Sequence, residues 1–369
     1  MIQLKSLHGV FGFEVQRYKS AVSGQEQSYL ELSQQFEGDH LSAGLRELIG
    51  YYSNRLSYSE VAQLVKRVSG TAIVSDQKAE QVVIATAEAI SQLCASQVKE
   101  PYKLPAIAPE VDLYAPEQAE VLLFADDILV KRQAAKRYPA GQKPEVSASS
   151  DERVTVTIPL VMLQQPDGRY HTFTEPLSER TILPQLVGQQ LEQLYGQSPV
   201  PLPLVAITDG ARTLRLFLLT LFGFMVTLIL DWYHLEKKVS DLMSMIALNK
   251  TAKEQHLAVI LPHLWRGLTT EALLYLDTLT PRNPNKLDEL RTYLQKHQPE
   301  IIDYQRRQEL GKAISSGRME KGCDLVVGHR QKKKGMSWSP RGSQALALLK
   351  IAELNHQWPL LWASPLVTT

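Results

Sequence analysis

The middle of the chain alternates short apolar runs with turns and helical segments. Apolar runs of strand length predict five strands, and a Pro-Asp-Gly turn within residues 165–168 joins the second strand to the third. Helical patterns predict one helix between the third and fourth strands and another between the fourth and fifth. The predicted strands cover residues 119–125, 154–163, 170–174, 200–207 and 226–230.

The first hundred residues are mostly helical in pattern. Residues 1–27 alternate only weakly, which fits short strands or a loose arm, whereas a helical pattern begins near residue 28 and runs to residue 99. Ser57 with Glu60 three residues later is a capping-box signature, and Gly70 separates the helix that follows from a second one. This pair resembles a helix-turn-helix with a long turn, and a plain helical bundle is the alternative. Its second helix would offer three side chains to DNA: Gln77, Lys78 and Gln81.

The second half of the chain predicts helices. Residues 235–312 have a helical pattern with breaks at Pro262, Pro281 and Pro284, and a later helix that begins near residue 318 carries Glu320. The first three strands can form an antiparallel meander because a tight turn joins two of them, and the last two should be parallel because helices connect them. This order is that of an RNase H-like α/β fold, a mixed five-stranded sheet with a helical insertion after its fifth strand.

These patterns predict four regions. An all-α N-terminal DNA-binding domain covers residues 1–112, with the helix-turn-helix near 57–97, and a Pro-rich stretch at 100–118 links it to the sheet. The RNase H-like domain begins with residues 113–234, the helical insertion covers 235–312, and residues 313–369 complete the domain with a basic C-terminal helix.

Three carboxylates are candidates for one site. Asp126 directly follows the first strand, Asp209 follows the fourth, and Glu320 lies on the late helix. In this topology the first and fourth strands are neighbours, so their ends meet at one edge of the sheet, where ligands bind in α/β folds. Acidic oxygen ligands suit Mg²⁺ or Mn²⁺, and a pair of such ions supports phosphodiester chemistry. Asp127 is the alternative to Asp126, and an N-cap is the alternative role for Asp209.

The composition is that of a globular protein, with 44% hydrophobic and 21% charged residues among 369. Cys94 and Cys323 lack metal-ligand spacing and favour a reducing cytoplasm, and the first residues lack a signal-peptide pattern. The apolar stretch 216–230 is shorter than the roughly 18–20 residues of a spanning helix, and Gly223 divides it. We therefore expect a buried helix and a strand there, with no membrane partner.

The net charge of the chain is only +1, so any affinity for nucleic acid must be local. Residues 306–350 contain eleven Lys or Arg and three Asp or Glu. This charge flanks the helix that carries Glu320 and predicts phosphate contacts, with a solvated face as the alternative. The predicted contacting side chains are Arg330, Lys332, Lys333 and Lys334. Trp338 is interpreted as a core anchor, with a base-stacking platform as the alternative.

Five short motifs occur in a fixed order along residues 119–350. They are Phe124-Ala125-Asp126-Asp127, Thr208-Asp209-Gly210-Ala211, Leu230-Asp231-Trp232-Tyr233-His234, Ser315-Ser316-Gly317-Arg318-Met319-Glu320 and Gly335-Met336-Ser337-Trp338-Ser339. Together they resemble bacterial insertion-sequence DDE transposases of the ISKra type, which are related to Mutator-like transposases. Three departures exist: many relatives have Gly where this chain has Asp127, some carry N-terminal cysteines, and compact enzymes have a shorter spacing before the last acid. The helical insertion accounts for the long spacing.

The resemblance implies a transposase that cleaves and joins element ends by metal-dependent phosphoryl transfer. It makes Asp126, Asp209 and Glu320 the catalytic ligands of two Mg²⁺ or Mn²⁺ ions. It also places Asp231 and His234 near them, with a histidine packed on Trp232 as the alternative for His234. The implied partner is double-stranded DNA, as terminal repeats and target, bound by a homodimer or larger assembly at the nucleoid. The competing functions are a nuclease or resolvase without strand transfer and an inactive, domesticated DNA-binding protein.

Overall fold

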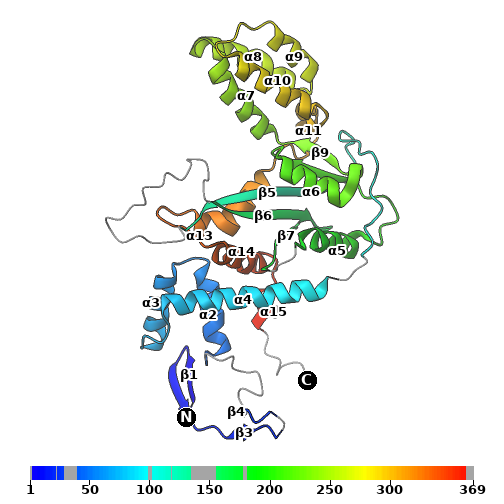
Figure 1. Cartoon of the computed structure of the whole chain (residues 1–369). Coiled ribbons are helices and arrows are strands. Elements are labelled where there is room, and N and C mark those ends of the chain that lie inside the picture. Colours follow the sequence, from blue (N-terminus) through cyan, green and yellow to red (C-terminus); the bar gives the residue numbers. More distant parts are fainter. Residues whose placement is uncertain are drawn as a thin grey trace.

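The computed structural model describes residues 2–21, 23–28, 40–98, 102–117, 119–133, 155–177 and 181–362. The start of the helix expected near residue 28 and most of the region between the first two strands of the sheet lie outside these ranges. Figure 1 shows an N-terminal region, a sheet with helices packed on it, and a helical block that projects from one edge of the sheet.

Five strands form one mixed sheet in the order β7-β6-β5-β8-β9. β5, β6 and β7 are antiparallel neighbours, whereas β5, β8 and β9 are parallel. The predicted strand order and directions are therefore confirmed, and they are compatible with an RNase H-like fold. The strands are β5 (Val121–Lys131), β6 (Thr155–Gln164), β7 (Tyr170–Thr174), β8 (Leu204–Thr208) and β9 (Thr227–Leu230).

β5 runs further than the sequence predicted. It was expected to end at residue 125, directly before Asp126, but it continues because β6 pairs with it as far as Lys131 opposite Thr155. Its pairing with β8 stops earlier, at Phe124 opposite Ile207. Asp126 therefore lies within a strand, just beyond the last parallel pair.

Helices cover both faces of the sheet because side chains alternate along each strand. Leu123, Ala125 and Ala206 pack on one side against α5 (Leu183–Tyr195) and α6 (Arg212–Phe222). The opposite side, with Phe124 and Ile207, packs against α12 (Gly317–Cys323) and α14 (Pro340–Leu354). α12 continues through a π-helical segment, η3 (Asp324–Gly328), into the short helix α13 (His329–Gln331).

The apolar stretch 216–230 divides as predicted into a helix and a strand. It forms most of α6, the 3-10 turn η1 (Gly223–Met225) and β9. The left-handed backbone of Gly223, with φ +62°, ends the helix. Within the described ranges, every helix is too short or too polar to cross a bilayer.

The N-terminal region is not all helical, so the all-α prediction is not confirmed. β1 (Ile2–Ser6) pairs with β2 (Gly9–Phe13), and β3 (Arg17–Lys19) pairs with β4 (Glu26–Ser28). Apolar and polar residues alternate in this segment and a Gly lies at the first turn, which favours hairpins over a helix.

Three helices follow: α2 (Ala43–Ser53), α3 (Tyr58–Ser69) and α4 (Asp76–Gln97). The predicted capping box is confirmed, because the Ser57 hydroxyl accepts the Glu60 N–H and the Glu60 carboxylate accepts the Ser57 N–H. Gly70, with φ +78°, ends α3. α4 packs against α2 and α3 and also against α14, so it joins this region to the sheet domain. The last helix, α15 (Trp358–Trp362), packs against α2.

The stretch between β9 and α12 is a helical block, as predicted. Its helices are α7 (Trp232–Ile246), α8 (Lys250–Trp265), α9 (Thr269–Asp277), α10 (Pro284–His297) and α11 (Tyr304–Glu309), with a 3-10 turn η2 (Gln298–Glu300) after α10. Pro284 starts α10, but the predicted break at Pro262 is wrong, since α8 runs on to Trp265. At this position, in the last turn of α8, the proline costs one helical hydrogen bond and not a whole helix.

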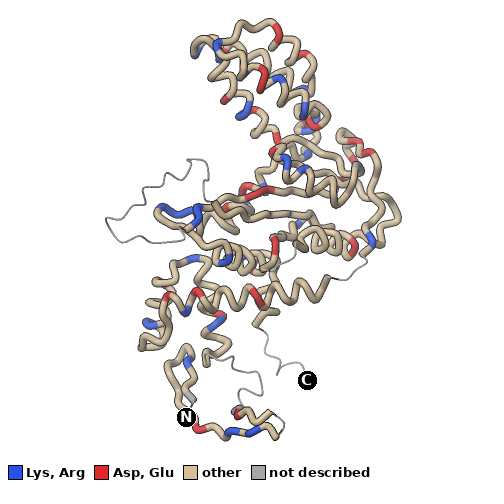
Figure 2. The backbone as a smooth tube through the Cα atoms, in the orientation of Figure 1, with Lys and Arg blue, Asp and Glu red and all other residues tan. Residues whose placement is uncertain are grey.

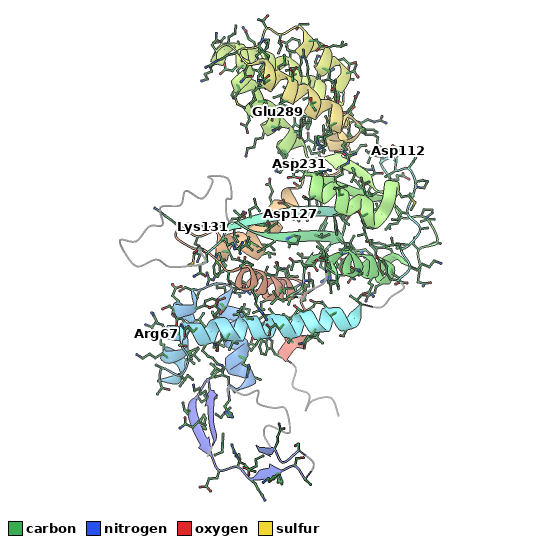
Figure 3. The ribbon with its side chains drawn as sticks, in the orientation of Figure 1. Arg67, Asp112, Asp127, Lys131, Asp231 and Glu289 are labelled. Atoms are coloured by element: carbon green, nitrogen blue, oxygen red, sulfur yellow. The ribbon has the colours of Figure 1, made fainter. Side chains whose placement is uncertain are left out.

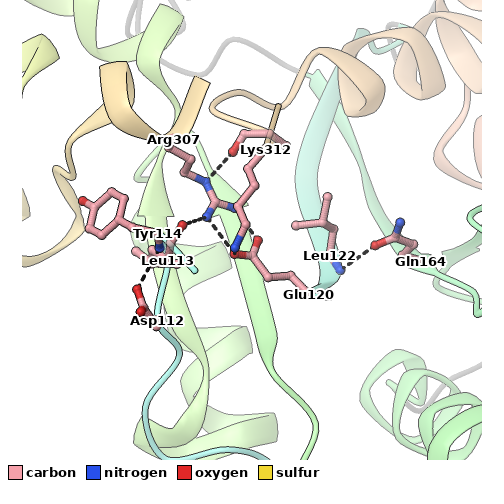
Figure 4. Close-up of polar contacts among 9 residues, drawn as sticks. Asp112, Leu113, Tyr114, Glu120, Leu122, Gln164, Arg307 and Lys312 are labelled. Carbon is pink, nitrogen blue, oxygen red and sulfur yellow. Dashed lines mark hydrogen bonds and ion pairs between the residues drawn. The ribbon is translucent and has the colours of Figure 1, made fainter. Parts of the chain in front are cut away.

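A buried ion-pair network joins the helical block to the start of β5 (Figure 4). Arg307 is fully buried and donates two hydrogen bonds to Glu120, of 2.9 and 2.5 Å, and Lys312 donates another of 2.8 Å. Arg307 also donates to the carbonyl oxygens of Leu113 and Ala313. The Arg307 guanidinium thus connects the segment before the sheet, the residue that directly precedes β5 and the end of the block.

Candidate active site at the ends of the parallel strands

Asp209 lies in a tight turn after β8. Its Oδ1 accepts the N–H of Ala211 at 2.8 Å, and Gly210 has φ +82°, a conformation that glycine adopts without strain. α6 begins at Arg212 with Ala211 at the N-cap position. The carboxylate of Asp209 is therefore held by its own turn and is not the N-cap of α6.

Asp126 and Asp127 point to opposite faces of β5. The Cys323 thiol on α12 donates to Asp126 Oδ2 at 3.4 Å, whereas the Thr213 hydroxyl on α6 donates to Asp127 Oδ2 at 3.2 Å. The pKa of Asp127 is raised, chiefly by burial and further by the charges of Asp126 and Asp209. Asp126 therefore faces the helix that carries Glu320, and Asp127 faces the other layer.

Asp231 at the end of β9 is buried and hydrogen-bonded on both oxygens. Oδ2 accepts the N–H and, at 2.6 Å, the hydroxyl of Ser316, while Oδ1 accepts the N–H of His234 at 2.9 Å. Burial alone would raise the pKa of Asp231, but the hydrogen bonds from His234 and Ser316 outweigh it and lower the pKa to about 2. Because Ser316 directly precedes α12, Asp231 fixes the start of the helix that carries Glu320. Figure 3 marks Asp127 on β5 and Asp231 after β9.

His234 lies within the field of three acids. Its Nδ1 is 3.3 Å from Asp231 Oδ1, and its pKa is raised first by this contact and then by the charges of Asp209 and Glu320. Residues from three separate elements therefore influence one imidazole. The side chain is 41% exposed, so the site is open to solvent at this point.

The chemistry of these side chains fits a divalent cation. After burial, the charges of Asp126 and Asp209 add to the raised pKa of Asp127, and a cation would relieve that repulsion. Mg²⁺ keeps several waters and needs only one or two carboxylates beside substrate phosphates. In the part of the chain that the structure describes, no three His, Cys, Asp or Glu side chains are close enough to enclose a metal ion by themselves. An ion at this position would need waters or substrate phosphates to complete its ligands, and its binding stays a prediction.

Three residues at this edge were missed by the sequence analysis. Cys323 lies three positions after Glu320 on α12, but it is buried whereas Glu320 is exposed, so their spacing alone did not indicate its contact with Asp126. Tyr293 and His297 come from α10, and nothing in their local sequence indicates that they approach Asp209. The pKa of Tyr293 is raised mainly by burial and next by the Asp209 charge.

The predicted lysine run lies beside the far end of β5. The Trp338 N–H donates to the carbonyl of Lys131 at 2.9 Å, and the Gln133 N–H donates to the carbonyl of Trp338 at 2.8 Å. Lys131 and Arg132 are exposed there, as is the whole run 332–334. Figure 2 shows Lys and Arg gathered along this segment. We call these five side chains the basic patch.

Arg330 does not belong to this patch, which corrects its predicted role in DNA binding. It is 4% exposed, donates from Nε to the carbonyl of Ser53 at 2.8 Å, and lies over the rings of Trp338 and Tyr58. Trp338 is also buried, and its indole N–H donates to the carbonyl of Gln331. Its interpretation as a core anchor is therefore confirmed.

The candidate helix-turn-helix has α3 and α4 as its two helices, separated by residues 70–75. Gln77 and Gln81 are exposed near the start of α4, and Lys78 is partly exposed. Contact of these residues with DNA stays a prediction.

No protein-family model matches this chain, and no curated protein matches it either. Among solved structures, the crystal structure of a pre-cleavage Mos1 transpososome is aligned over 89% of this chain and 78% of that chain, with 14% identity and a TM-score of 0.14. A likeness at this score is too weak to assign a fold or a function.

Proposed function

We propose that this chain is a DNA transposase that cleaves and joins the ends of an insertion sequence. The observation that carries the proposal is that β5, which contains Asp126, pairs in parallel with β8, which Asp209 follows, and packs against α12, which carries Glu320. His234 lies in the field of two of these acids, and Cys323 links Asp126 to α12. The five motifs that resemble those of DDE transposases support the same conclusion.

In this proposal Asp126, Asp209 and Glu320 hold two Mg²⁺ or Mn²⁺ ions. When bound, such ions activate a water or a 3′-hydroxyl and stabilise the leaving oxygen of a phosphodiester. Asp231 keeps the start of α12 in place, and His234 balances part of the negative charge. The basic patch binds the phosphate backbone of double-stranded DNA. Joining two element ends requires at least a homodimer.

Strand cleavage and joining test the proposal directly. The substrate is a supercoiled plasmid that carries this coding sequence with its genomic flanking DNA on both sides, incubated with purified protein, Mg²⁺ or Mn²⁺ and a target plasmid. We expect nicks at the element ends and joining of their 3′ ends to the target. Asp209→Ala and Glu320→Ala should each abolish both products and keep DNA binding, while the exposed-site control Asp288→Asn should behave as wild type.

The other outcomes separate the competing functions. Cleavage without joining would indicate a nuclease or resolvase. DNA binding with neither cleavage nor Mn²⁺ binding would indicate an inactive DNA-binding protein. Cleavage that persists in Asp209→Ala or Glu320→Ala would disprove the assignment of the site.

A further inference from the structure

A buried histidine from the helical block packs against the Asp209 turn. His297, the last residue of α10, is 1% exposed, and its Nδ1 lies 2.7 Å from Glu300 Oε2. A Cβ atom placed on Gly210 would be 3.0 Å from His297 Cε1 and 3.3 Å from Nε2. The edge of the imidazole therefore lies directly against the backbone of the residue that follows Asp209.

The pair of His297 and Glu300 is also connected to α6, the helix that follows the turn. Arg215 Nη1 lies 2.8 Å from Glu300 Oε1, so one carboxylate joins η2 to α6. The N–H of Arg215 donates to the carbonyl of Ala211, which anchors Arg215 to the end of the turn. The contacts thus form a closed ring from Gly210 through α6, Arg215, Glu300 and His297 back to Gly210.

This ring supplies a support that the turn needs. Gly210 has a positive φ and the flexibility of glycine, so packing from outside the turn adds to the constraint that the hydrogen bond between Asp209 and Ala211 provides. Glu300 is nearly buried, and a buried charge with its partners in place resists displacement because separation would leave it uncompensated. His297 transmits this rigidity to the turn by packing against it.

We propose that His297 is a positioning residue for Asp209, through which the helical block holds the metal-binding carboxylate in place. The inference rests on the proposed function, because it assigns the block a role in metal affinity. It also gives the helical block a role at the site in addition to any contact with DNA.

Two variants and one matched control test this role. His297→Asn keeps a polar group near Glu300 but removes the ring atoms next to Gly210, and Glu300→Gln keeps the side-chain shape but removes the charge. His256→Asn is the control, because it breaks a histidine–tyrosine contact of 3.0 Å, between Nδ1 and the Tyr275 hydroxyl, in the same block. Circular dichroism of each full-length variant establishes that it is folded.

The first readout is hydrogen–deuterium exchange of the peptide that spans residues 205–216. The second is Mn²⁺ affinity by electron paramagnetic resonance. We expect faster exchange in this peptide and Mn²⁺ binding weakened by about 10-fold in both variants, the size typical of residues that orient metal ligands, and neither change in the control.

Each other result overturns the inference. Unchanged exchange in the turn, or the same increase in His256→Asn, would show that His297 does not hold it. Faster exchange with unchanged Mn²⁺ affinity would show that the turn moves without consequence for Asp209. If the wild-type protein binds no Mn²⁺, both the proposed function and this inference are disproved. If the wild type binds Mn²⁺ and the variants bind it equally well, this inference alone is disproved.

Discussion

Replacing Asp231 with Asn tests whether this carboxylate holds the helix that carries Glu320. Asparagine has nearly the same size, but one oxygen becomes an amide donor. Asp231 Oδ2 accepts both the N–H and the hydroxyl of Ser316, so an amide nitrogen at that position would face a backbone donor. Either that donor loses its partner or the start of α12 moves away from β9.

The structure sets the size of the effect. The pKa of Asp231 falls from 3.8 to about 2 in the folded protein. At about 1.4 kcal/mol per pKa unit, this shift corresponds to about 2 kcal/mol of stabilisation in the ionised form. An unpaired buried N–H costs about 1–3 kcal/mol, and the two contributions overlap, so we expect Asp231→Asn to lower the free energy of unfolding by about 2–4 kcal/mol at pH 7.

The pH dependence has a definite sign. The folded pKa is below the unfolded one, so the stabilisation is complete above about pH 4 and is lost as the pH falls toward 2. Urea unfolding followed by circular dichroism, repeated between pH 7 and pH 3, should show the wild-type and Asp231→Asn curves converging in acid. Asp288→Asn is the control, since that side chain is 68% exposed. The reasoning would be refuted if Asp231→Asn were as stable as this control at pH 7. It would also be refuted if the difference in unfolding free energy between wild type and Asp231→Asn did not change with pH.

Four further predictions concern other parts of the molecule. Glu120→Gln leaves the buried Arg307 without its charged partner and should cost about 3–5 kcal/mol in urea unfolding; a loss below 1 kcal/mol, on that same scale, would contradict the role of the network. Gly210→Ala puts a residue with a Cβ at a backbone position with positive φ, so it should cost about 1–3 kcal/mol in urea unfolding. It should also weaken Mn²⁺ binding measured by calorimetry, and an unchanged affinity would contradict a role of the turn in the metal site. Changing 332–334 together to Gln should reduce the salt dependence of DNA binding, with a slope smaller by about 0.9 for each phosphate that the variant no longer neutralises, and leave stability unchanged. Arg330→Gln should instead lower the unfolding midpoint and leave the salt dependence of DNA binding unchanged.

Local signals in the sequence determined most of the secondary structure. The Asp-Gly turn and the apolar runs predicted β6 and β7 to within one residue, and Ser57 with Glu60 predicted the start of α3. Gly223 correctly divided the apolar stretch into helix and strand. Each of these features depends on backbone preferences and side-chain periodicity over a few residues, which act in the same way whatever surrounds them.

The sequence also predicted that the strands of Asp126 and Asp209 would be neighbours, because strand order follows from the connections between strands. The surroundings of these acids depended on contacts between distant segments. Pairing with β6 carried β5 beyond Asp126, and packing against Tyr58 and Trp338 buried Arg330, which looked like a surface cation. His297 reached Gly210 only because the helical block folds back on the end of β8. Burial and long-range pairing depend on the whole chain at once, and for that reason the tertiary structure alone decided them.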